Sequence, residues 1–208
     1  MIYDDQLKRL KEGLRRWNQF RGRHRQQQVY LAYADLRNLD LNKYDLSDAQ
    51  LSCADLRGAK LDEANLDSAK LDGAKLSKAS LVGACLRGAW LRRAVLSDVN
   101  LSGTDLRQAR ANNVDLRRAN LEASDLRDVH LSGANLRGSN LFGADLRSAD
   151  LDGADFSTAR LGEANLTRAG LHNASFRNSW FGFTTLGDND LSEARNLESV
   201  EGRHGSGL

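Results

Sequence analysis

The side chains that could do chemistry are few and scattered. The 208-residue chain has four histidines and two cysteines. They are His24, His130, His172, His204, Cys53 and Cys85. No two of them have the spacing of a metal-ligand pair, and the two cysteines give no disulfide framework. There is also no nucleophile beside a base, no carboxylate pair arranged for acid–base work and no phosphate-binding glycine loop. The sequence therefore predicts no enzyme, no metal site and no cofactor.

Electrostatic binding is the chemistry that remains, and its strongest signal lies in the first 25 residues. Eight basic residues there outnumber three acidic ones, so this stretch carries +5 and leaves −3 for the rest of a chain whose net charge is +2. The candidates for a basic surface are Arg15, Arg16, Arg21, Arg23 and Arg25. A solvated helix face explains this charge, and so does a site for an acidic protein, a nucleic acid or an anionic lipid surface.

A helix is needed to present these arginines. Apolar residues recur there at three- and four-residue steps: Leu7, Leu10, Leu14, Trp17 and Phe20. The spacing predicts one amphipathic helix from about Asp5 to Arg21, with Asp4 and Asp5 at its N-terminus. We expect residues 1–26 to form a basic cap whose apolar stripe covers the open end of the next element.

The next element is a repeat of five residues. From residue 31 to residue 191 a large apolar residue occupies every fifth position without insertion or deletion, which gives (191 − 31)/5 + 1 = 33 centres. All are leucine except Ala111, Phe156, Phe176 and Phe181. A helix needs apolar residues near every 3.6 positions and a strand at every second, so this period indicates a stacked solenoid. The absence of proline suits an unbroken hydrogen-bonded ladder.

The repeat resembles the motif of the pentapeptide-repeat family: a small residue, Asp or Asn, Leu, then two variable positions. Ala54-Asp55-Leu56, Ala64-Asn65-Leu66 and Ala144-Asp145-Leu146 carry it. The stretch Trp17-Asn18-Gln19-Phe20-Arg21 resembles a helical lead-in found before such arrays in cyanobacterial-type proteins. The resemblance implies an all-β solenoid, a right-handed quadrilateral β-helix of about eight coils, ~40 Å long at a coil spacing of ~4.8 Å.

On that fold, residues twenty apart are stacked. The predicted core includes Leu36, Leu56, Leu76, Leu96, Leu116, Leu136, Phe156 and Phe176. The same sorting gives two candidate partner surfaces. One is an arginine ladder, Arg87, Arg107, Arg127 and Arg147, beside an aspartate ladder that should largely neutralise it. The other is an aromatic patch, Phe142, Trp180 and Phe183, which is open unless the C-terminal segment covers it.

The C-terminal segment is expected to close the far end of the rod. Asp190 and Glu193 have the spacing of a helix capping box, and an apolar stripe follows them. We therefore expect the β-helix to span residues 27–190, a short capping helix to span 190–200, and residues 201–208 to form a flexible tail.

A rod with a filled core points to binding. We expect a non-catalytic protein-interaction module or rigid scaffold with an unidentified protein partner, either a monomer or an end-to-end dimer. The resemblance adds an alternative: a DNA mimic that protects a type II topoisomerase, DNA gyrase, although such rods are strongly acidic and this one is not. Binding of nucleic acid or an anionic surface through the basic helix is a second alternative.

The N-terminus gives an expectation about location. Its first residues include two acids and no apolar run, so we expect no signal peptide and no membrane span. The sequence favours a cytoplasmic bacterial protein.

Overall fold

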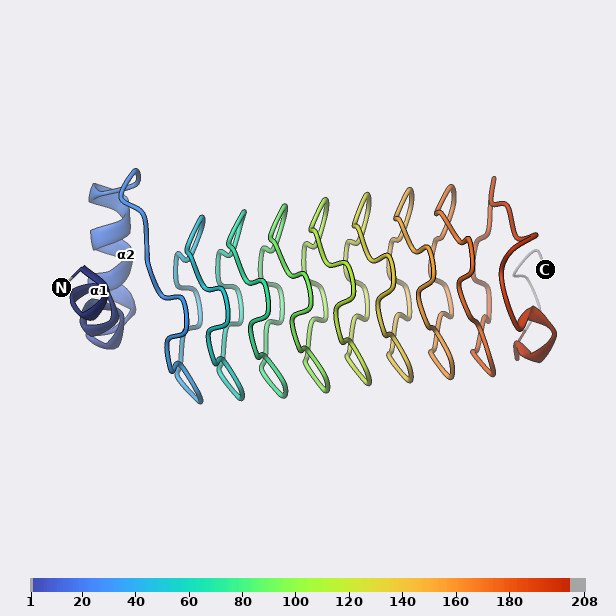
Figure 1. Cartoon of the computed structure of the whole chain (residues 1–208), viewed down its shortest axis with the longest axis horizontal. Coiled ribbons are helices and arrows are strands. Elements are labelled where there is room, and N and C mark those ends of the chain that lie inside the picture. Colours follow the sequence, from blue (N-terminus) through green and yellow to red (C-terminus); the bar gives the residue numbers. More distant parts are fainter. Residues whose placement is uncertain (1, 203–208) are drawn as a thin grey trace.

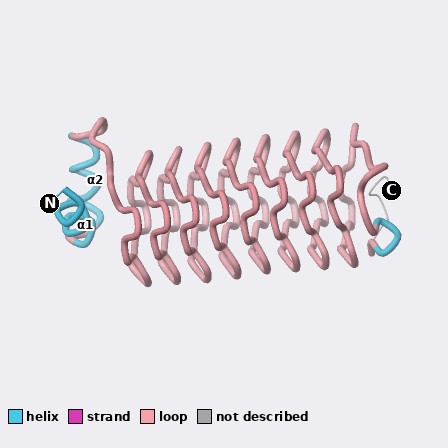
Figure 2. Tube along the Cα trace, in the orientation of Figure 1, coloured by secondary structure: helices cyan, strands magenta, loops and turns pink. Residues whose placement is uncertain are grey.

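Two helices and a stack of coils make up the molecule (Figure 1). The structure, a computed structural model, describes residues 2–202. Its elements are α1 (Ile2–Lys11), α2 (Leu14–Arg23) and a short 3₁₀ helix, η1 (Leu197–Ser199). Between α2 and η1 the chain winds into a rod without further helices or strands in the described residues (Figure 2). The helices α1 and α2 lie at one end of the rod, and η1 lies at the other.

Single parallel bridges join the coils of the rod. Tyr30 pairs with Gln50, and the same step of twenty residues continues to the bridge between Asn165 and Thr185. A coil therefore takes four pentapeptides. Between coils, the Leu36 amide donates to the Asp55 carbonyl at 2.8 Å and the Asp55 amide donates back to Ala34 at 2.9 Å. This ladder satisfies the backbone of each coil, which is the condition for burying it.

A tight turn follows each central residue. The Ala34 amide donates to the Leu31 carbonyl at 3.1 Å, and the third residue of the turn, Tyr33, has φ = 61°. From residue 33 to residue 188 every fifth residue has a positive φ, and most of these residues are not glycine. The pattern is that of type II turns, whose third position favours glycine. The left-handed conformation costs an L-residue about 1–2 kcal/mol, so the rod carries this cost in coil after coil.

Two neighbouring turns allow a direct test of that cost. Gly103 (φ = 64°) and Ala123 (φ = 53°) occupy the same turn position in successive coils, and a Cβ on Gly103 would meet no atom within 4 Å. Exchanging the residue type at each position therefore changes backbone strain with little change in packing. We expect Ala123→Gly to raise the free energy of unfolding by about 0.5–1 kcal/mol and Gly103→Ala to lower it by a similar amount. Urea denaturation of both variants measures this, and shifts of the same sign would show that φ is not the cause.

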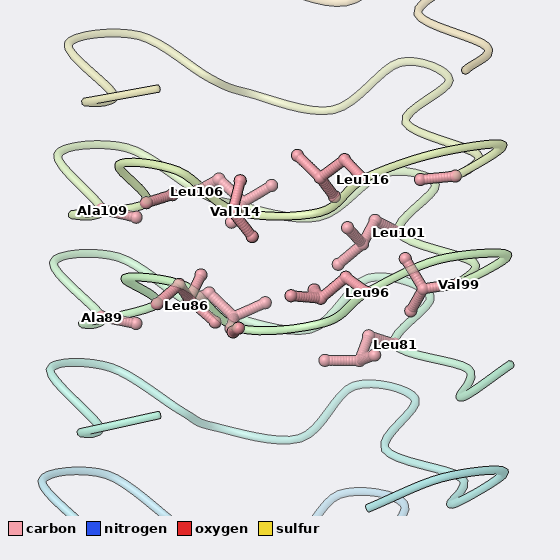
Figure 3. Packing of buried hydrophobic residues seen from close by; sticks show 14 of the residues in the cluster. Leu81, Leu86, Ala89, Leu96, Val99, Leu101, Leu106, Ala109, Val114 and Leu116 are labelled. Atoms are coloured by element: carbon pink, nitrogen blue, oxygen red, sulfur yellow. The ribbon is translucent and has the colours of Figure 1, made fainter. Parts of the chain in front are cut away.

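Leucine and alanine fill the interior of the rod. The eight predicted core residues, from Leu36 to Phe176, are all 4% exposed or less. Residues twenty apart lie one above the other, as Leu96 and Leu116 do in Figure 3. Near the C-terminal end aromatic rings fill the interior: Phe156 and Phe176 are stacked with centroids 5.2 Å apart, and Phe181 meets Phe176 edge-on at the same distance.

The N-terminal segment differs from the single helix predicted from sequence. It forms α1 and α2, which are separated at Gly13, whose φ of 106° is open to glycine but not to other residues. After this break α2 turns Trp17 and Phe20 to the rod, with 0% and 9% exposure. Leu10 is buried and Leu7 packs against the core, but Leu14, which was predicted to pack as well, is 37% exposed because it begins α2 on the solvent side.

The predicted capping helix over residues 190–200 is also wrong. Its residues 190–196 continue the coil pattern, and only η1 is helical. Asp190 accepts the Ser192 amide at 2.9 Å, a local turn and not a helix cap. The five-residue register decides this outcome: Arg195 still donates its amide to the Ala174 carbonyl at 2.8 Å. Of the predicted tail, Glu201 and Gly202 belong to the rod end, and residues 203–208 lie outside the described residues.

Candidate interaction surfaces

The N-terminal helices bind the first coil through hydrogen bonds that replace a missing coil. The first coil has no preceding coil to pair with, so its edge amides and carbonyls need other partners. Gln6 supplies two, because its Nε2 donates to the Gln28 carbonyl at 2.8 Å and its Oε1 accepts the Tyr30 amide at 2.7 Å. Trp17 Nε1 donates to the Asp45 carbonyl at 2.7 Å. These side chains therefore end the ladder and shield an edge that would otherwise invite pairing with another chain.

Arg21 belongs to this contact and not to an exposed basic surface, so its prediction was wrong. Its side chain is 4% exposed, and its Nε lies 3.6 Å from Asp45 Oδ2. The Nη2 atom donates to the carbonyl and the hydroxyl of Ser47, at 2.7 and 3.1 Å. Arg21 follows Trp17 by four residues, which places both on the face of α2 that meets the rod.

The other predicted basic residues of the cap remain on the surface. Arg16 pairs with Glu12 at 3.4 Å, one turn earlier. Arg15, Arg23 and Arg25 are exposed, and no ion pair joins them to the side chains of residues 5–202. The cationic surface of the cap is therefore smaller than the sequence indicated.

The predicted arginine ladder is closely paired with aspartates. Arg127 bridges two coils, with Nη2 2.7 Å from Asp125 and Nε 3.6 Å from Asp145. Arg107 repeats this arrangement with Asp105 and Asp125, whereas Arg87 pairs with Asp67 of the preceding coil and Arg147 with Asp145 of its own coil. Hydrogen bonds from Arg127 hold the pKa of Asp125 below its usual value, against the opposing effect of desolvation. These guanidinium groups are therefore paired with carboxylates of the same chain, and little net positive charge remains on the ladder for a partner to bind.

The predicted aromatic patch is divided between buried and open rings. Trp180 lies over a column of three glycines, Gly162, Gly182 and Gly202, so closely that a Cβ at any of them would collide with the indole. It is half-buried and helps to close the end of the rod. Phe142 is also half-buried, whereas Phe183 is 68% exposed. The C-terminal segment therefore covers Trp180 and leaves Phe183 accessible.

A ladder of amides extends from this patch along the same outward positions. Asn120 donates to Asn100 at 3.3 Å, and Asn140 donates to Asn120 at 3.1 Å. On this side of the rod, Glu122 is the single charged residue among the outward positions from Ser80 to Gly143. We call this surface, with Phe142 at its edge, the amide stripe.

A cluster around Trp90 was missed by the sequence analysis. Lys70 Nζ, Arg92 and Arg110 lie over the indole ring at 5.5, 5.2 and 4.7 Å from its centroid. These are cation–π contacts, which hold the cations in place. Beside them a shallow hollow of about 490 Å³ includes Arg92 and Arg93 in its lining. The signal lies in the step of twenty residues, which places Lys70, Trp90 and Arg110 in one column of the rod.

The histidine, cysteine and acidic side chains of residues 5–202 form no candidate metal centre. No group of three or more His, Cys, Asp or Glu there is placed to hold a metal ion. Cys53 and Cys85 are both free thiols. No helix of this part of the chain is long and apolar enough to cross a bilayer. The features that remain are outer surfaces on a filled solenoid.

Comparison with known proteins agrees with this architecture. Two trypsin-treated variants of QnrB1, a plasmid-mediated fluoroquinolone resistance protein, share 20% identity with the chain at TM-scores of 0.53 and 0.56. The matches cover 84% of this chain and 83% and 89% of those chains. HetL, a pentapeptide repeat protein involved in heterocyst differentiation regulation from the cyanobacterium Nostoc sp. strain PCC 7120, is 30% identical over 88% of this chain and 96% of its own, at a TM-score of 0.30. Comparison with functionally curated proteins gives no match.

The stacked coils and the likeness to the QnrB1 structures define a right-handed β-helical solenoid, and in this chain two N-terminal helices cap it. The family model for pentapeptide repeats matches eight copies in segments that run from residue 27 to residue 182. The chain belongs to the pentapeptide-repeat family.

Proposed function

We propose that the chain is a non-catalytic protein-interaction module that works in the bacterial cytoplasm. It is a four-sided rod of about eight coils that presents fixed side chains to a protein partner. The filled interior is the observation that carries this proposal: central residues such as Leu56 and Phe156 are 0% exposed and the alanines between them are buried as well. Binding groups therefore lie on the outer stripes, whose spacing the ladder fixes.

The amide stripe is the surface we assign to the partner. The centre of a protein interface is typically depleted of charged residues and enriched in aromatic residues. The stripe has both properties, with Glu122 its one charge between Ser80 and Gly143 and with Phe142 at one end; Phe183 follows two coils further along the same side, beyond Arg160 and Glu163. The arginine ladder is less suited, because a partner would have to displace carboxylates that already bind it.

Affinity capture from a bacterial lysate tests this assignment. The baits are the intact chain, Phe183→Lys and Tyr33→Lys. Tyr33 is a matched control, since it is an exposed aromatic (78%) at the same turn position, with φ = 61° against 58° for Phe183. We expect a protein that the intact chain and Tyr33→Lys retain and Phe183→Lys loses. Equal retention by all three baits would contradict the assignment of the stripe.

Gyrase protection is the alternative that the family offers. The likeness to QnrB1 at 20% identity supports the fold, and the paired arginines argue against a DNA-like acidic potential. We expect a stoichiometric excess of the chain to leave gyrase supercoiling and its inhibition by a fluoroquinolone unchanged. Relief of that inhibition would favour this alternative over the amide stripe.

Polyanion binding through the cap is the remaining alternative, and it rests on Arg15, Arg23 and Arg25. It requires affinity for DNA or anionic vesicles that falls steeply with salt. An Arg15→Gln/Arg23→Gln/Arg25→Gln variant would then lose binding, whereas the interaction module would retain its protein partner.

A further inference from the structure

One stripe of the rod reverses its charge halfway along. It consists of the outward residues around Trp90 and those twenty, forty or more positions away, and we call it the Trp90 stripe. Its first column reads Lys70, Trp90, Arg110, His130, Asp150, Gly170 and Asp190. The half before His130 is basic and the half after it is acidic, so the column is antisymmetric in charge about residue 130.

The basic half has an aromatic residue at its centre. Trp90 is half-exposed and stands between Lys70 of the coil before and Arg110 of the coil after, 5.5 and 4.7 Å from its ring centroid. No ion pair forms to Lys70, Arg92 or Arg110 among the side chains described at residues 5–202, in contrast to the arginine ladder, whose members each meet a carboxylate within 4 Å. Cations without a carboxylate partner in their own chain are available to a carboxylate of another molecule.

The acidic half carries a hollow of matching character. Gly170 lies in a depression of about 180 Å³ whose rim includes Asp152, Asp190 and Glu193. Glycine at residue 170 leaves the floor of this depression without a side chain, and the Asp152 carboxylate lies beside it, since its Oδ1 would be 3.0 Å from a Cβ at that position. The aromatic centre and the hollow lie four coils apart, at equal distances from His130.

We propose that a second copy of this chain docks on the Trp90 stripe, face to face and antiparallel. A two-fold axis that crosses the rod at His130 exchanges each position of the column with the one equally far on the other side. Lys70 then meets Asp190 of the partner copy, Arg110 meets Asp150 of the partner copy, and Trp90 enters the hollow at Gly170 of the partner copy. Every contact occurs twice, as in any isologous dimer. His130 lies at the axis, where its ring faces its own Asp150 at 3.8 Å.

A second copy fits this surface better than a polyanion does. A nucleic acid or long acidic peptide that bound the basic half would continue along the rod onto Asp150, Asp152 and Asp190, which repel it. The dimer also leaves the amide stripe open, since that stripe lies two pentapeptides away in each coil, and it does not depend on the proposed function.

The size of the contact predicts a weak dimer. From Lys70 to Asp190 the stripe spans six coil steps, about 29 Å at ~4.8 Å a step, and its width is ~15 Å. Two copies would bury about 900 Å², below the ~1,200 Å² of a stable interface. We therefore expect dimerisation at high micromolar concentration and low salt, and loss of the dimer as salt screens the ion pairs.

Sedimentation velocity of charge-reversed chains tests the proposal. Arg110→Asp alone and Asp150→Arg alone each place two like-charged pairs in the homodimer, so each is expected to raise the dimer dissociation constant at least tenfold. An equimolar mixture of the two restores both pairs in a heterodimer, and we expect it to recover the wild-type constant. Arg177→Asp makes the same charge change on a different stripe and is expected to leave association unchanged. All samples contain a reductant, because Cys53 is exposed.

The mixture decides the outcome. Wild-type protein that stays monomeric at several hundred micromolar in low salt would overturn the proposal. A mixture of the two variants that associates no better than either variant alone would also overturn it. If Arg110→Asp then abolished binding of an acidic peptide or a DNA oligonucleotide, that polyanion would be the occupant of the stripe. Circular dichroism of each variant checks that the rod is intact. We expect it to be, because the substituted residues lie on the surface.

Discussion

Replacement of Leu96 by alanine is expected to lower the free energy of unfolding by about 2–5 kcal/mol, toward the upper end of that range. Leu96 is 1% exposed and lies between Leu76 and Leu116 of the neighbouring coils, as Figure 3 shows for Leu116. The Leu96 amide stays bonded to the Asp115 carbonyl at 2.7 Å, and its neighbours are bonded in the same way. Because this ladder fixes the coil spacing, the coils cannot collapse into the space that the lost methyl groups leave, and the cavity persists.

Chemical denaturation of three variants measures this effect. Leu14→Ala removes the same atoms from a 37% exposed side chain and should change stability by less than about 0.5 kcal/mol. Leu96→Met keeps most of the volume and should cost less than about 1.5 kcal/mol. If Leu96→Ala cost no more than Leu14→Ala, the interior would not be the main source of stability, and the ladder alone would have to hold the rod together.

The five-residue period predicted the core because it is a direct product of the stacking. Each centre occupies the same place in its pentapeptide, so its burial follows from its position in the sequence, and Leu36 and Phe176 are buried alike at 0%. The turn geometry was less visible. Residue types as different as Tyr33, Ala123 and Asp188 share a positive φ, which the ladder imposes whatever the side chain.

The ends of the rod could not be predicted in the same way, because they depend on distant partners. Apolar spacing runs through Gly13 as if one helix continued, and only the docked position of α2 shows that the chain turns there. Arg21 has the composition of a surface residue, and its burial is explained by the Ser47 carbonyl 26 positions away. Asp190 and Glu193 match a capping box by spacing, but the bond from Arg195 to Ala174 keeps the segment in the ladder.

The surfaces show the same limit. The arginine ladder was visible because acid and base alternate within each Asp-Leu-Arg unit. The Trp90 cluster combines residues from three coils, Lys70, Trp90 and Arg110, and nothing in the local sequence of any one of them marks it. The periodicity of the sequence thus predicts the features that every coil shares. It does not predict a surface such as the Trp90 cluster, whose residues differ from those at the same positions of other coils.

Trp17→Ala is expected to undock the N-terminal helices from the rod. The side chain is 0% exposed, its ring centroid lies 5.7 Å from that of Phe20, and its Nε1 supplies the hydrogen bond to the Asp45 carbonyl. Loss of a buried aromatic costs about 3–5 kcal/mol, and the carbonyl left without its donor adds to the cost. Because coils contact only their neighbours, this loss should fall on the first coil and leave distant coils folded.

Hydrogen exchange resolves that local effect. The Tyr30 and Asp45 amides donate hydrogen bonds to the cap side chains Gln6 and Asn18. In Trp17→Ala we expect the exchange of these two amides to accelerate at least a hundredfold. The Leu136 amide, bonded to Asp155 near the middle of the rod, should exchange at the wild-type rate, and Arg15→Ala, an exposed change in the same helix, should alter neither. The uncovered edge should also promote salt-insensitive aggregation, because backbone groups and not charges would then mediate association. If exchange instead accelerated equally along the whole chain, the cap and the coils would unfold as one unit. The stability of the entire rod would then depend on the contact between α2 and the first coil.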